Sequence, residues 1–262
     1  MDKDLIIRYN KELRTESAIN IHGITIHPVL YKDYDNYHSF VGCLLYNPVY
    51  YKDIELSSLP RLYFLTSILN DIKDENIEDI AGHQQRRTLF VQLYGLLRLV
   101  LKDQPFYFDE TSKGSSYFAL KVKTKDGDIT INAKKFEQLR EIILIQNNTY
   151  YDDEYIHPDI LKWIEEQKKI DAKRESKNSF TTVEDRLEAL MIEFNTTDEH
   201  YFDNKTIRRV DRLISKITDR ELYVAQMTGS MSGMVKFKES PVSWVSTKLP
   251  QSDFDKYLKE LK

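Results

Sequence analysis

The spacing of apolar residues along the chain predicts a protein built mainly of helices. In several segments apolar side chains recur at intervals of three and four residues, which is the period of an amphipathic helix. We therefore expect helices near 33–46, 58–72, 87–101, 158–177, 181–194 and 207–225, one after Asn132, and a short one within 252–262. The segment 87–101 is apolar nearly all round, which predicts the most buried helix of the first half of the chain.

Two other segments alternate apolar and polar residues, which is the period of a β-strand. The segment 117–132 holds two such runs, and Asp126-Gly127 between them supplies the positive φ that a tight turn needs. This pattern predicts a β-hairpin. A shorter alternation at 19–26 predicts a strand with a bulge or tight bend at Gly23. The expected fold class is α+β, predominantly helical.

The character of the sequence changes after Asn148. An acidic, tyrosine-rich connection leads to Pro158, where a heavily charged helix with few apolar positions begins. Further on, Thr181 and Glu184 have the spacing of a capping box, which predicts the start of the next helix. We therefore expect an N-terminal helical region with a hairpin over residues 1–148 and a C-terminal helical region over 149–262.

Composition excludes several classes of protein. The chain has 262 residues, of which 41% are hydrophobic, and this is enough apolar mass for a core. A net charge of −4 removes a global attraction to nucleic acid, and no apolar run is long enough to cross a membrane. The single cysteine, Cys43, cannot form an intrachain disulfide, which is usual in a reducing cytosol.

Candidate chemical motifs are incomplete, so we expect a protein that is not an enzyme and that has no metal or cofactor. The segment 229–233 has Met231 where a nucleophile elbow needs serine. The six histidines lack the spacing of metal ligands. One enzymatic alternative remains, a metal-dependent nuclease with Asp109, Glu110 and Lys121 near the predicted hairpin.

Aromatic and methionine side chains are the candidate contact residues. Tyrosine buries a large area at little entropic cost, and methionine adapts to varied partners. The candidates for binding a partner are Tyr150, Tyr151, Tyr155, Trp163, Met231 and Met234. Packing at the edge of the core explains the tyrosines equally well, and gap filling inside the core explains the methionines.

Parts of the sequence resemble a known family. The segments 24–45, 136–147, 150–158 and 230–238, the last followed by Trp244, resemble tail-region proteins of bacteriophages that infect Gram-positive bacteria. The resemblance implies a tail assembly protein, expected to act in the host cytoplasm as a chaperone of the tape-measure protein or of another tail protein. Typical tail chaperones are shorter and often made in two frameshifted lengths, and this sequence shows neither. A structural component of the virion tail or baseplate is therefore the alternative.

Overall fold

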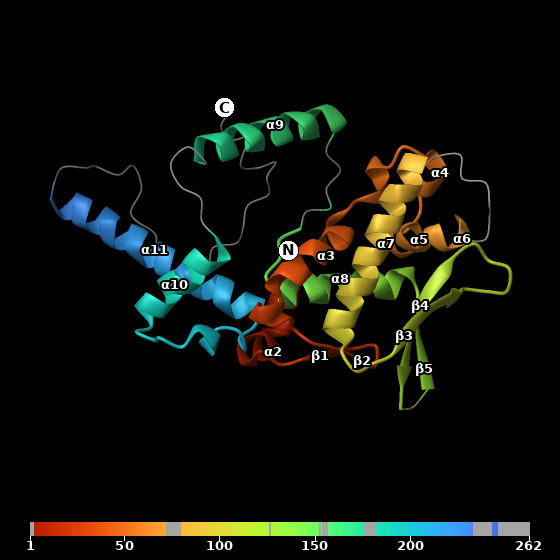
Figure 1. Cartoon of the computed structure of the whole chain (residues 1–262), viewed down its shortest axis with the longest axis horizontal. Helices are drawn as coiled ribbons and strands as arrows, with labels where there is room; N and C mark the ends of the chain where they lie inside the picture. The colour runs from red at the N-terminus through yellow and green to blue at the C-terminus, as the bar shows by residue number, and fades with distance from the viewer. Residues whose placement is uncertain are drawn as a thin grey trace. The chain divides into compact units, whose positions relative to one another are not determined.

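The computed structural model describes residues 3–71, 80–125, 127–151, 153, 157–175, 182–232 and 243–245. The chain forms two compact units, Met1–Ile156 and His157–Lys262, and each is described by itself (Figure 1). Helices dominate both units, and two small antiparallel sheets lie in the first, which confirms the α+β class. Within the described part of the chain, no helix has both the length and the apolar character needed to span a bilayer.

The first unit contains eight α-helices among its described residues. They are α1 (Lys3–Arg8), α2 (Asn10–Thr15), α3 (Tyr34–Leu45), α4 (Ile54–Ser57), α5 (Arg61–Thr66), α6 (Ile68–Asp71), α7 (Ile80–Leu101) and α8 (Ala133–Gln146). The single helix expected at 58–72 begins only after Pro60, and it is divided at Ser67. There Ser67 N donates to Phe64 O and Asn70 N donates to Ser67 O, each three residues back instead of four. Asn132 caps α8 as expected, since its Oδ1 accepts a hydrogen bond from Lys135 N at 3.0 Å.

The segment 19–26 is a hairpin and not the single bent strand that the alternation predicted. Strand β1 (Ile19–Ile21) pairs antiparallel with β2 (Ile24–Ile26). His22 and Gly23 connect them with φ angles of 53° and 80°, the left-handed pair that a two-residue hairpin turn requires. A Cβ at position 23 would lie 2.8 Å from Ile129 Cδ1, the tip of a side chain that can turn aside, so the positive φ is the main reason for glycine there.

The predicted hairpin at 117–132 is confirmed, but it belongs to a three-stranded sheet. Strands β4 (Phe118–Thr124) and β5 (Gly127–Ile131) pair antiparallel, with Leu120 opposite Ile131. An additional strand, β3 (Phe106–Glu110), pairs with the other side of β4. The sequence analysis did not identify β3, whose first three residues are all aromatic and show no alternation.

The core of the first unit lies between α3, α7, α8 and the apolar face of the sheet. Helix α7 is amphipathic, since Val91 is 57% exposed and Tyr94 is 44% exposed. The expectation that this is the most buried helix of the first half was therefore wrong. Its inner face packs against α3, and Gly95 allows the close approach of the Phe40 ring. The second half of α8 is more completely buried than α7.

The second unit contains three α-helices in its described part. They are α9 (Pro158–Glu175), α10 (Val183–Glu193) and α11 (Ile207–Met231). The capping box of α10 is formed by Thr182 and Asp185, one residue later than the expected pair. Few side chains of this unit are fully buried, among them Leu190 and Phe202. The helix expected within 252–262 lies outside the described residues.

Candidate functional site

The structure places the predicted contact residues in different environments. Tyr150 and Tyr151 are half-buried in the first unit, and Trp163 is half-buried on α9 in the second. Met231, at the end of α11, is 83% exposed. Tyr155 and Met234 lie outside the described residues. The tyrosines are thus partly used for packing, whereas Met231 presents its side chain to solvent.

Two buried arginines organise the segment around Tyr151. The Arg140 side chain is 1% exposed and that of Arg61 is 8% exposed. Arg140 Nε donates to Leu44 O at 2.7 Å, and Arg61 Nε donates to Tyr46 O at 3.0 Å. Both guanidinium groups therefore hold carbonyl groups at the C-terminal end of α3, where a helix has unpaired acceptors.

Asp153 joins the two arginines through its carboxylate. Arg140 Nη1 and Nη2 donate to it at 2.7 and 2.8 Å, and Arg61 Nη2 donates at 3.1 Å. Glu137 accepts a further bond from Arg61 at 2.7 Å. Burial alone raises the pKa of Asp153, but the hydrogen bonds and charges of the arginines outweigh it, and the pKa lies below its ordinary value.

This cluster anchors the connection that follows α8. The Tyr151 ring lies over the Arg140 guanidinium, 4.8 Å from centroid to Cζ, and Tyr37 Oη lies 2.6 Å from Thr149 Oγ1. Residues 149–151 and 153 therefore pack with the first unit, Met1–Ile156. The domain boundary at 148/149 stays a prediction. The sequence signal was Arg140 itself, because it lies within the apolar face of α8 and a buried charge needs partners.

The candidate nuclease residues do not converge. Asp109 and Glu110 are neighbours on β3, so their side chains point to opposite faces of the sheet. Asp109 Oδ2 pairs with Lys121 Nζ at 2.5 Å, and this hydrogen bond lowers the pKa of the carboxyl group. Glu110 Oε2 accepts from Gly114 N at 2.9 Å. Across the described ranges, no group of three or more His, Cys, Asp or Glu side chains is placed to hold a metal ion.

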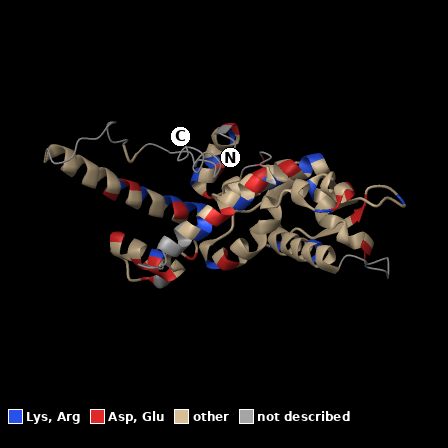
Figure 2. Cartoon of the chain, turned by 90° about the horizontal axis from the view of Figure 1, so that it is seen from above, with Lys and Arg blue, Asp and Glu red and all other residues tan. Residues whose placement is uncertain are grey.

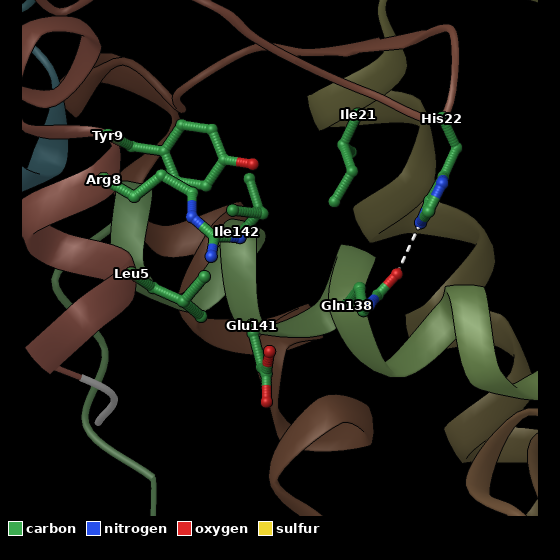
Figure 3. A pocket seen from close by; sticks show the side chains of 8 residues that line it. All are labelled: Leu5, Arg8, Tyr9, Ile21, His22, Gln138, Glu141 and Ile142. Carbon is green, nitrogen blue, oxygen red and sulfur yellow. Dashed lines mark hydrogen bonds between the residues drawn. The ribbon is translucent and has the colours of Figure 1, made fainter.

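A small cavity lies between α1, the β1–β2 turn and α8 in the first unit. Its volume is about 220 Å³, below the roughly 300 Å³ at which ligand pockets usually begin. Figure 3 shows His22 and Gln138 pointing toward one another, and His22 Nε2 lies 2.6 Å from Gln138 Oε1. The Glu141 carboxylate points away from that pair. The cavity brings together no nucleophile and base.

Helix α11 carries several exposed apolar side chains. Its seam residues follow one another at three- and four-residue steps, and all but Glu221 are apolar: Ile207, Val210, Ile214, Ile217, Glu221, Val224, Met227 and Met231. Only the first two are buried, while Val224 is 55% exposed and Met231 is 83% exposed. Figure 2 shows that the far end of α11 carries no charge, in agreement with the sequence 222–231.

Polar contacts hold other parts of α11 in place. Thr206 Oγ1 caps its first turn by accepting from Arg209 N at 3.2 Å. Arg220 pairs with Glu193 of α10 at 2.7 Å, and Lys216 Nζ donates to Trp244 O at 2.8 Å. These bonds lie beside the apolar seam, and they leave the Val224 and Met231 side chains open to a partner.

Comparison of the chain with family models, curated proteins and solved structures found no match in any of the three.

Proposed function

We propose that this protein is a non-enzymatic assembly protein of a bacteriophage tail, acting in the host cytoplasm by binding the tape-measure protein or another tail protein. The segments that resemble tail-region proteins support the phage context. The exposed seam of α11 supports binding to another polypeptide. The two lines of support are independent, because the first rests on sequence motifs and the second on surface exposure.

The single observation that carries the proposal is the uncovered half of the α11 seam. A helix that is apolar at three- and four-residue steps buries that face against another helix or in a groove. Burying a Val or Met side chain completely is worth roughly 1.5–3 kcal/mol. Val224 and Met231 together therefore offer about 2–4 kcal/mol to a partner, since both are more than half exposed.

Glu221 gives this seam a preference for the charge of its partner. It occupies the seam position between Ile217 and Val224, and it is exposed. A helical partner that covers Val224 then needs a basic or uncharged group opposite Glu221, because an acidic one would be repelled at close range. Tape-measure proteins are long and helical, so such a partner is available during tail assembly.

The test is co-expression with the tape-measure polypeptide of the same phage. The wild-type protein should keep that polypeptide soluble and copurify with it. The variant Val224→Asp/Met231→Asp should lose both effects, because it places two charges on the seam. The matched control Thr218→Asp/Ser230→Asp places the same charges on exposed positions off the seam and should bind like the wild type. Equal loss in both variants, or no rescue by the wild type, refutes the proposal.

Mass spectrometry of purified virions separates an assembly factor from a permanent component of the tail or baseplate. An assembly factor acts before the tail is complete and should be absent. A permanent component should be present in a fixed ratio to the major tail proteins.

A further inference from the structure

We propose that the outer edge of strand β3, together with the exposed stripe of α7 beside it, binds an extended polypeptide segment with a carboxylate at each end. The occupant would add a fourth strand to the sheet β3-β4-β5. The proposal concerns the first unit alone, and it does not depend on a role in tail assembly or on the α11 seam.

The peptide groups of β3 are arranged for such an addition. Pro105 O accepts from Lys123 N, and Thr111 N donates to Tyr117 O, so odd-numbered residues of this segment bond to β4. In an antiparallel pair the residues between them direct their N–H and C=O groups the other way. The peptide groups of Phe106 and Phe108 therefore point away from β4, toward an edge that no other strand of the described residues covers.

The opposite edge of the sheet, formed by β5, is protected against pairing with another strand, whereas the β3 edge is not. On β5 the outward Thr130 carbonyl accepts a bond from Lys135 Nζ at 3.2 Å. Charges and side-chain hydrogen bonds are the usual means by which edge strands avoid pairing. The β3 edge has aromatic residues at the equivalent positions. An edge without such protection is suited to a partner strand.

Helix α7 supplies a wall beside this edge. The rings of Phe90 and Phe108 are 5.3 Å apart, and those of Tyr94 and Phe106 are 5.1 Å apart. From Phe90 to Tyr94 the chain advances four residues along α7, while their ring partners on β3 lie two residues apart in the opposite direction. The helix therefore runs antiparallel to the strand beside it. Val91 and Tyr94 are exposed on the outer side of α7. Alternate apolar side chains of an added strand could pack against them.

Two exposed arginines determine which charge the bound peptide segment should carry. Arg87 and Arg98 are exposed on the same stripe as Val91 and Tyr94, and neither forms an ion pair with any described residue. Eleven residues of helix span about 16 Å, which corresponds to about five residues of extended chain. The nearest acidic groups on β3 are engaged, Asp109 by Lys121 and Glu110 by Gly114 N. A segment with flanking carboxylates therefore complements this surface.

The probe is a seven-residue peptide blocked at both ends, with glutamate at positions one and seven, valine at three and five, and threonine elsewhere. Its glutamates lie on the same face as the valines, about 20 Å apart, and the long Glu and Arg side chains span the difference from about 16 Å. Binding is measured on the full chain by fluorescence anisotropy, and its location by amide-resolved hydrogen exchange. The amides of Phe106 and Phe108 should exchange at least about tenfold more slowly with peptide present. Those of Tyr107 and Asp109, which already bond to β4, should not change.

Charge variants test the role of the arginines. Arg87→Glu/Arg98→Glu should weaken binding at least about tenfold and should prefer a peptide with lysine in place of glutamate. The control Lys11→Glu/Arg14→Glu changes two exposed charges on α2 and should bind like the wild type. Unchanged melting temperatures show that each variant is folded. The proposal fails if the glutamate peptide does not bind, if it binds no better than the lysine peptide, or if it protects amides elsewhere.

Discussion

Replacing Asp153 with asparagine removes the charge that two buried guanidinium groups share. Asp153 accepts three hydrogen bonds from Arg140 and Arg61, whose side chains are 1% and 8% exposed. The substitution keeps the shape of the side chain and one acceptor oxygen. It leaves Glu137 as the remaining carboxylate for both arginines.

The expected loss follows from the burial of each partner. Removing one member of a buried ion pair costs about 3–5 kcal/mol, because the other charge stays buried without compensation. The Asp153 side chain is 44% exposed, so water replaces part of the lost interaction. We therefore expect the free energy of unfolding of the first unit to fall by about 2–3 kcal/mol. For a unit of this size that corresponds to a melting temperature lower by about 4–12 °C.

The assay is urea and thermal unfolding of the full chain by circular dichroism, with hydrogen exchange of α8 amides to assign the transition to the first unit. Because the pKa of Asp153 is lowered in the folded state, its stabilising effect is complete above the ordinary value of about 3.9. That effect is lost as pH falls through the lower folded value. The difference between wild type and variant should therefore be constant from pH 7 to 5 and shrink below pH 4.

Two results would refute this reasoning. One is a loss below about 1 kcal/mol at pH 7, which is the range of an exposed ion pair. The other is a difference between wild type and variant that does not change down to pH 3. Asp103→Asn is the control, since Asp103 is exposed in the same unit, and it should change the free energy of unfolding by less than about 0.5 kcal/mol.

Three further predictions concern single positions. Gly95→Ala should lower the free energy of unfolding by about 1 kcal/mol or more, since its Cβ would lie 2.8 Å from two Phe40 ring carbons. Gly42→Ala should raise the free energy of unfolding by about 0.5–1 kcal/mol, because alanine favours the helix more than glycine does. Urea titrations of both variants and the wild type measure the two changes. Burial raises the pKa of Cys43 to about 12, so a thiol reagent at pH 8 should label it only after unfolding, and rapid labelling of the folded protein would contradict its burial. Thr182→Ala should destabilise α10 by about 1 kcal/mol, because the helix loses its N-terminal cap. Hydrogen exchange of the first α10 amides should become faster in this variant, whereas Glu184→Ala, the control, should have little effect.

Local features of the fold were predictable, and features that depend on distant partners were not. The cap at Asn132 and the hairpin 117–132 follow from neighbouring residues, and both are present. The turn at His22-Gly23 was misinterpreted because the isoleucine alternation resumes after Gly23 with its phase shifted by one residue, which is also the pattern of a bulge, and histidine is not a usual first residue of such a turn. Strand β3 has no alternation of its own, and its partners lie across a connecting loop on β4, from Phe118 opposite Glu110 to Val122 opposite Phe106.

The sequence offers two possible capping boxes for α10. Thr181 and Thr182 each have an acidic residue three positions later, so the sequence alone allows two starting points for α10. In the structure Thr182 accepts from Asp185 N at 3.0 Å and Asp185 Oδ2 accepts from Thr182 N at 2.6 Å. The spacing alone does not distinguish the two starting points.

The candidate sites were predicted only in part. Met231 was named from its residue type and is 83% exposed, and its contact role stays a prediction. The Arg61–Arg140–Asp153 cluster joins residues far apart in the sequence, so spacing could not reveal it. The unpaired edge of β3 could be recognised only from the strand register.

The central claim is that α11 covers an apolar surface of another tail polypeptide, and cross-linking from the seam tests it most directly. A photoreactive amino acid is placed at position 224 or, as the control, at position 218, and the protein is co-expressed with the tape-measure polypeptide of the same phage. The account predicts a cross-link to that polypeptide from 224 and little or none from 218. Equal yields from both positions, or no cross-link from 224, would contradict it.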